Sequence, residues 1–196
     1  MNFAHLLVLF SALLTVVAAS AYIRDTLKGK TKPNRVSWLL WALFPLIGTA
    51  AAFQANADIW ATIRVLLAGF LPLIIFLTSF WNQKSYWRLT LFDWFCGACA
   101  LLAIAVWFIL DSPKIGILFA VIGDGFAALP TFVKAWKYPK TETGLTYMIN
   151  LIAVLLVIPS IPTWNIENSA FQIYLLAANL ILIISIYRKK FSASGR

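Results

Sequence analysis

The sequence predicts an all-α membrane protein with seven transmembrane helices in a 3+1+3 plan, in which two parallel three-helix repeats flank one linking helix. The first observation is composition: 62% of residues are hydrophobic, 12% are charged and the mean hydropathy is +0.85. Soluble domains are far less apolar. The second observation is a series of seven apolar runs, and the third is the placement of Lys and Arg in the connections on one side of them.

Each apolar run has between 17 and 22 residues, which is about the length that a helix needs to cross the hydrocarbon of a bilayer. The runs cover residues 3–23, 36–53, 59–80, 89–110, 115–133, 145–161 and 170–187. Proline inside a helix removes a backbone hydrogen bond and bends it, and glycine permits hinging or close packing. The candidate gating and hinge positions in these runs are therefore Pro45, Pro72, Gly123 and Pro130.

The first run ends in Ala19-Ser20-Ala21, which resembles a signal-peptidase site. A signal peptide carries its basic residues before the apolar run, whereas here Lys and Arg follow it. We therefore expect the first helix to be retained, with the N-terminus outside the cell.

The basic residues provide a test of the span count. With the N-terminus outside, 14 of the 16 Lys and Arg fall in the segments after spans one, three, five and seven. The two exceptions are Arg64 and Lys114. This distribution predicts an integral protein of the cell membrane with a cytoplasmic C-terminus. The net charge of +9 therefore indicates orientation in a bilayer, and no nucleic-acid partner is expected.

A weak internal repeat supports the same plan. Residues 28–41, KGKTKPNRVSWLLW, align with residues 134–147, KAWKYPKTETGLTY, at an offset of 106 residues that also relates the surrounding apolar runs. Three crossings reverse the side of the chain, so two parallel repeats need an odd linking span. We expect a first repeat over residues 1–83, a linker helix over residues 84–113 and a second repeat over residues 114–196.

The chain resembles the PQ-loop and SWEET superfamily of small-solute transporters over nearly its whole length. Residues 128–147, ALPTFVKAWKYPKTETGLTY, are similar to the proline-led end of the fifth helix in SWEET facilitators and the loop after it, with Pro130 at that family's helix proline. The chain departs from the pattern at Tyr22-Ile23-Arg24, where a PQ dipeptide is expected, and at Ile149, which is not proline. Bacterial nicotinamide riboside transporters share a related plan. The resemblance implies facilitated or coupled transport of a sugar or vitamin-precursor solute by alternating access.

Polar residues inside apolar spans are the candidate binding groups, because they are costly in hydrocarbon. Asp124 lies near the middle of the fifth span, and counting the rise per residue places two amides at a similar depth in the sixth and seventh. By resemblance, Asn179 stands where SWEET transporters have an asparagine at the sugar site. Trp41 and Tyr147 could stack on a ring or close an inner gate. The predicted substrate-binding residues are Trp41, Asp124, Tyr147, Asn150 and Asn179.

Structural roles remain open for each of these residues. Asp124 could be a hydrogen-bond donor between helices, the two asparagines could pair helices, and the two aromatic rings could pack against lipid or core. Arg64 could extend to the outer headgroups, pair with Asp124 or gate an anionic solute. Asp93 is expected to pair with Arg88 or Lys84.

Cys96 and Cys99 form a CGAC motif in the fourth span, which supports an alternative function as a thiol redox membrane enzyme. Neither further cysteines nor a metal-ligand cluster accompany them, so packing is the favoured role and no cofactor or metal is expected. A non-transporting membrane receptor or organiser is a third hypothesis. The expected partners are the lipid bilayer and a small-molecule solute, with a homo-oligomer left open.

Overall fold

The computed structural model describes residues 3–54, 59–109, 113–160, 164 and 166–193. Over these residues the chain forms seven α-helices and no strand, which confirms the predicted all-helical class. The α-helices are α1 (Phe3–Leu27), α2 (Arg35–Gln54), α3 (Ile59–Thr78), α4 (Leu91–Ile109), α5 (Pro113–Lys137), α6 (Gly144–Val157) and α7 (Ile166–Ala193). Three short 3-10 turns are η1 (Gln83–Ser85), η2 (Pro139–Thr141) and η3 (Ile158–Ser160).

Three of the helices have the length and apolar composition needed to cross a membrane, over His5–Leu27, Leu118–Lys137 and Ser169–Arg188. The other described apolar segments are shorter: Arg35–Leu46, Leu66–Thr78, Leu91–Val106 and Gly144–Val157. Large apolar side chains also cover the outside of the bundle. On α4, for example, Trp94, Phe95 and Leu102 are 62%, 62% and 65% exposed. A surface of this kind suits lipid far better than water.

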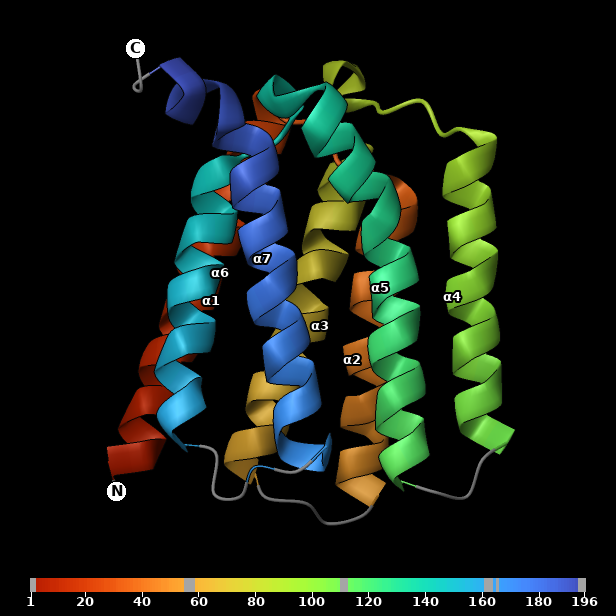
Figure 1. Cartoon of the computed structure of the whole chain (residues 1–196), viewed down its shortest axis with the longest axis vertical. Coiled ribbons are helices and arrows are strands. Elements are labelled where there is room, and N and C mark those ends of the chain that lie inside the picture. Colours follow the sequence, from red (N-terminus) through yellow and green to blue (C-terminus); the bar gives the residue numbers. More distant parts are fainter. Residues whose placement is uncertain (1–2, 55–58, 110–112, 161–163, 165, 194–196) are drawn as a thin grey trace.

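The helices run along a common bundle axis, with α4 at one edge (Figure 1). α3 packs against both α1 and α2, and α7 packs against both α5 and α6. The α1–α6 and α2–α5 contacts join these two groups. α4 is held mainly by α5, with a smaller contact to α2. The connections α1–α2, α3–α4 and α5–α6 meet at the end of the bundle where α7 finishes (Figure 1).

Glycines allow the tightest helix approaches. A Cβ at Gly123 of α5 would lie 2.5 Å from Cζ of Phe44 on α2, and a Cβ at Gly69 of α3 would lie 2.8 Å from Cγ of Leu46. Neither position can hold a larger residue without displacing its neighbour. Gly123 was predicted to serve either hinging or close packing, and its surroundings show close packing.

Asn34 connects the start of α2 to the start of α4. Its Oδ1 accepts from the backbone N–H groups of Val36 and Ser37, so it caps α2, and its Nδ2 donates to Asp93 Oδ1 at 2.6 Å. The other Asp93 oxygen accepts from the Thr90 hydroxyl at 2.6 Å. The expected pairing of Asp93 with a basic neighbour is therefore wrong. Asp93 is buried, at 3% exposure, and its partners are neutral donors, one of which lies 59 positions away.

We expect Asn34→Ala to lower the free energy of unfolding by about 2 kcal/mol, because it removes a helix cap and a donor to a buried carboxylate. Thermal denaturation of the purified protein in detergent measures the effect. Asn82→Ala is a matched control, because Asn82 also caps a turn, at Lys84, and also donates to a distant residue, the Leu27 carbonyl, but at an exposed site. Equal losses from the two substitutions would contradict the role given to Asn34.

Candidate functional site

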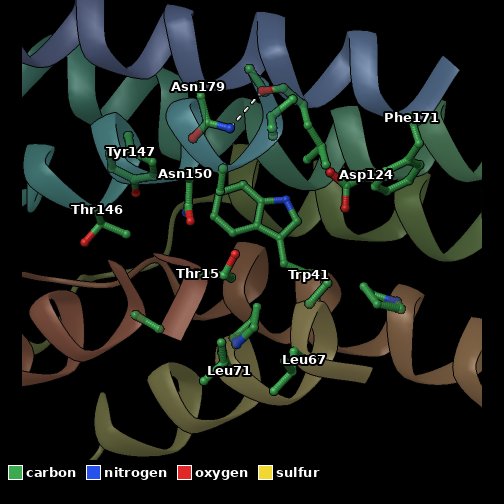
Figure 2. A pocket seen from close by; sticks show the side chains of 18 of the residues that line it. Thr15, Trp41, Leu67, Leu71, Asp124, Thr146, Tyr147, Asn150, Phe171 and Asn179 are labelled. Carbon is green, nitrogen blue, oxygen red and sulfur yellow. Dashed lines mark hydrogen bonds between the residues drawn. The ribbon is translucent and has the colours of Figure 1, made fainter. Parts of the chain in front are cut away.

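One cavity of about 530 Å³ lies inside the bundle and is lined by residues of α1, α2, α3, α5, α6 and α7. Figure 2 shows its centre. The structure brings all of the predicted binding residues into its lining, together with two of the predicted hinge prolines. These residues are Trp41, Asp124, Tyr147, Asn150, Asn179, Pro45 and Pro72.

Asp124 provides the only charged group among the described lining residues. It lies in the middle of α5 and is 5% exposed. The Tyr174 hydroxyl and the Trp41 indole N–H line the same cavity and are hydrogen-bond donors available to its carboxylate. These two donors come from α7 and α2, so the carboxylate faces helices of both groups. It therefore offers an acceptor to a molecule that enters the cavity.

The two asparagines form a separate polar region. Asn179 Nδ2 donates to the Leu175 carbonyl of its own helix at 2.8 Å, so this bond does not join two helices. Its amide oxygen is not used by that bond. Within the described part of the chain, the Asn150 side chain has no hydrogen-bond partner. Both amides thus keep hydrogen-bonding capacity for a ligand, which is the arrangement expected of binding groups.

Aromatic rings make up much of the remaining wall. The Trp41 ring packs edge-on against Trp38, with ring centroids 5.1 Å apart at 87°. In Figure 2, Trp41 lies between Asp124 on one side and Asn150 and Asn179 on the other. The three polar groups therefore share one cavity, and in this view the indole lies between the carboxylate and the two amides.

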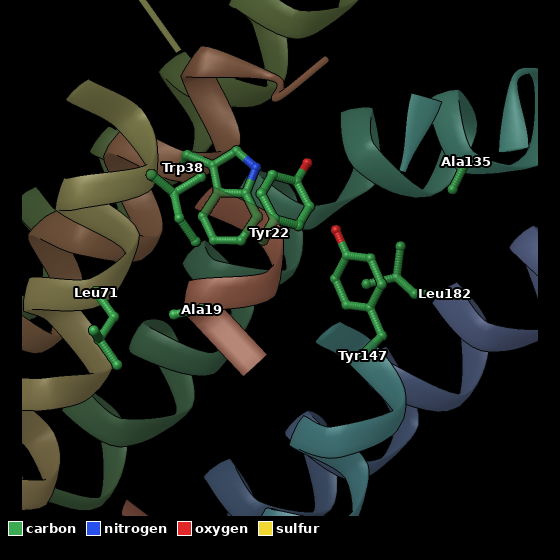
Figure 3. Packing of buried hydrophobic residues seen from close by; sticks show 8 residues of the cluster. Ala19, Tyr22, Trp38, Leu71, Ala135, Tyr147 and Leu182 are labelled. Atoms are coloured by element: carbon green, nitrogen blue, oxygen red, sulfur yellow. The ribbon is translucent and has the colours of Figure 1, made fainter. Parts of the chain in front are cut away.

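One end of the cavity is closed by a buried cluster that includes Tyr22, Trp38 and Tyr147 (Figure 3). The Tyr22 and Tyr147 hydroxyls each donate to Glu142 Oε2 at 2.8 Å. The other oxygen of Glu142 forms an ion pair with the Lys134 ammonium, which also donates to the Lys32 carbonyl. We call Tyr22, Lys134, Glu142 and Tyr147 the floor network.

Further bonds surround the floor network and join the two matching segments. The Thr31 and Thr143 hydroxyls lie 2.6 Å apart, and Lys32 N donates to the Thr141 carbonyl at 2.9 Å. Residues 28–41 and 134–147, which were aligned from sequence, therefore contact one another directly. They form the closed end of the cavity.

Sequence reasoning missed Tyr22, Lys134 and Glu142 as functional candidates. The two charged residues stand in or beside a polar connection between apolar runs, where charges are ordinarily solvated. Both side chains are buried here, with Lys134 1% and Glu142 8% exposed. An available signal is the scarcity of acidic residues, of which the chain has seven, so that a glutamate among many lysines is notable.

The remaining predicted hinge and gate residues lie elsewhere or are not described. Pro130 is buried within α5 and lines a second hollow, between α4 and α5, instead of the cavity. Arg64 belongs to α3, but its side chain is outside the described residues, so the expected outer gate or pairing with Asp124 stays a prediction.

Cys96 and Cys99 are free thiols on α4, and Cys96 is buried. A Cβ at the intervening Gly97 would lie 2.9 Å from Val36 Cγ1, which places this stretch in a tight contact with α2. No group of three or more potential metal ligands occurs among the residues that were described.

Comparison of the chain with protein-family models, with curated proteins and with solved structures finds no match. Functional inference therefore depends on the cavity and on the residues that close it.

We expect Glu142→Gln to destabilise the protein by about 3–5 kcal/mol, because Lys134 would remain buried without a counter-charge. Combining it with Lys134→Met removes both charges and should recover a large part of the loss. Thermal denaturation of both single variants and the double variant forms a double-mutant cycle. Additive losses would show that the pair has no coupling. Arg24→Gln, which breaks an exposed pair with Asp25, is the control and should cost less than about 1 kcal/mol.

Proposed function

We propose that the chain is a membrane transporter that carries a small solute through this cavity by alternating access. The observation that carries the proposal is one internal cavity, closed at one end by a polar network and lined with hydrogen-bonding groups that are free to bind a ligand. Its volume of about 530 Å³ falls within the usual range for small-molecule sites. Small-solute sites between two helical units are typical of transporters.

We propose further that all seven helices cross the membrane and that α1–α3 and α5–α7 are two parallel repeats joined by α4. The helix contacts support this plan, because α3 lies on α1 and α2 as α7 lies on α5 and α6. In this plan α1 corresponds to α5 and α2 to α6. The contact of α1 with α6 therefore has its counterpart in the contact of α5 with α2. Two hydrogen bonds between the units are related in the same way. Thr131 donates to Ser37 at 2.9 Å, and Thr143 donates to Asp25 at 3.1 Å. At the 106-residue offset Asp25 corresponds to Thr131 and Ser37 to Thr143, so each bond is the counterpart of the other.

The floor network supports a mechanism in which the two units separate at the basic end of the bundle, where the Lys- and Arg-rich connections α1–α2, α3–α4 and α5–α6 meet. Tyr22 and Lys32 belong to the first unit, whereas Lys134 and Glu142 belong to the second. The contacts across the floor include hydrogen bonds from Tyr22 to Glu142 and from Lys134 to the Lys32 carbonyl, in which water can replace a partner when the units move apart. In the present arrangement the floor is shut. Opening it and closing the opposite end would expose the cavity to the other side.

The lining indicates the kind of solute. One carboxylate, two amides and several aromatic rings suit a molecule with a flat apolar face and a few polar groups. A vitamin precursor with a ring fits this description, and a sugar could stack its apolar face on Trp41. The proposed partners are this solute and the lipid bilayer, and the proposed location is the cell membrane with the N-terminus outside.

A topology experiment tests the seven-span proposal. A reporter fused after Arg196 should be cytoplasmic and a tag before Met1 should be accessible from outside, because seven crossings place the two ends on opposite sides. Protease protection in intact cells and in inverted vesicles makes the measurement. Both ends on one side would contradict an odd number of spans.

Uptake tests the cavity. In proteoliposomes offered a panel of sugars and vitamin precursors, Asn179→Ala and Asp124→Asn should each reduce uptake at least about tenfold, because each alters a group that contacts the solute. Both variants should reach the membrane in normal amounts.

Ser185→Ala is the matched control for Asn179→Ala. Ser185 is also buried in α7 and also donates to the carbonyl four residues earlier, at 2.7 Å, but it does not line the cavity. Uptake by this variant should stay near that of the unaltered protein. Normal uptake by both cavity variants, or an equal loss in Ser185→Ala, would overturn the proposed site.

A further inference from the structure

A second hollow, of about 840 Å³, lies between the start of α4 and the end of α5. We call it the α4–α5 groove. Its walls come from the connection before α4, the first turn of α4 and the last two turns of α5, including Pro130. Proline interrupts the backbone ladder of α5, and beyond it the helix leans away from α4 (Figure 1). The groove occupies the space that this divergence leaves at the basic end of the bundle.

The net charge of the side chains that line the α4–α5 groove is positive. Asp93 lines the groove and keeps its negative charge, because its partners Asn34 and Thr90 are neutral donors, and Lys134 is paired with Glu142. Arg88 and Lys137 also line the groove, and both are exposed. Among the residues that the structure describes, neither has an acidic partner. Two cations from different elements therefore line one groove together with the single carboxylate of Asp93, which leaves a net positive charge.

The walls between these cations are aromatic and aliphatic. The Trp87 and Tyr138 rings bridge the groove with centroids 5.6 Å apart, and the Lys134 ammonium lies 5.3 Å from the Trp87 ring. Phe92 and Val133 continue the groove along α4 and α5, and they are 43% and 38% exposed. Trp and Tyr are the side chains that occupy the headgroup level of a membrane. The groove thus has a cationic headgroup region and an apolar extension.

We propose that the α4–α5 groove binds one anionic phospholipid, with the phosphate between Arg88 and Lys137 and an acyl chain along Phe92 and Val133. Basic pockets between helices on the cytoplasmic side suit anionic headgroups. The lipid would fill the gap on α5 and fasten α4, whose main contacts among the described residues are with α5 and, less extensively, α2. This inference requires that the helices lie in a membrane, but it does not depend on transport.

Binding to the full-length protein in detergent, followed by native mass spectrometry, tests the proposal. The probes are phosphatidylglycerol and phosphatidylcholine with the same acyl chains, and glycerol phosphate without acyl chains. The unaltered protein should retain one phosphatidylglycerol at least about tenfold more tightly than either other probe. Arg88→Gln combined with Lys137→Gln should weaken phosphatidylglycerol about 30-fold, which corresponds to about 1 kcal/mol per basic side chain.

Lys28→Gln combined with Lys30→Gln is the matched control, because it removes two exposed basic side chains at the same end of the bundle but outside the groove. It should change binding less than about threefold. Equal retention of the two lipids, or equal losses in the two double variants, would overturn the proposal in favour of a non-specific surface charge. Glycerol phosphate that binds as tightly as the lipid would reduce the groove to a phosphate site. The comparison of lipids on the unaltered protein decides the case even where a variant does not fold.

Discussion

The buried carboxylate of Glu142 is the interaction on which the closed end of the cavity depends. A charge removed from water is tolerated only where it is paired and hydrogen-bonded. Glu142 meets this condition through Lys134 and two tyrosine hydroxyls, and Tyr22 supplies its hydroxyl from the other helix group. The apolar cluster around it cannot substitute for any of these partners. The positions of α1, α5 and α6 at this end are therefore fixed together, because a shift of one would leave a polar atom unsatisfied.

This constraint also determines the cavity above the floor. Tyr147 is held by its hydroxyl at Glu142 while its ring lines the cavity, so one side chain belongs to both. On α5, Lys134 lies ten residues after Asp124, about 15 Å along a regular helix. Pro130 stands between them. A change in the bend at this proline would move the floor cation relative to the cavity carboxylate, which gives the proposed transport cycle a direct mechanical connection between gate and site.

The helices and the cavity residues could be predicted because each has a local signal. An apolar run of about 20 residues indicates a helix, and Asp124, Asn150 and Asn179 are conspicuous because polar groups in such runs are rare. The floor network has no local signal. Lys134 and Glu142 resemble ordinary loop charges, and their burial arises only when two segments about 100 residues apart come together. Asp93 was misassigned for the same reason, since its partner Asn34 is distant in sequence while Arg88 is near. The place of the Trp41 ring in the same cavity wall depends on packing that residue counting does not show.

The distribution of polar contacts indicates which interface can open. Between the proposed units, hydrogen bonds run from Ser11 to the Ala153 carbonyl, from Thr146 to the Ala18 carbonyl and across the floor. Each exchanges one polar partner for another when water enters, so its net free-energy cost is about 1 kcal/mol. Tightly packed apolar surface occurs both within the first unit, where Gly69 brings α3 against Leu46 on α2, and between the units, where Gly123 brings α5 against Phe44 on α2. On the proposed cycle, the contact between α2 and α5 at Gly123 should therefore persist, and the hydrogen-bonded floor should be the part of the seam that yields.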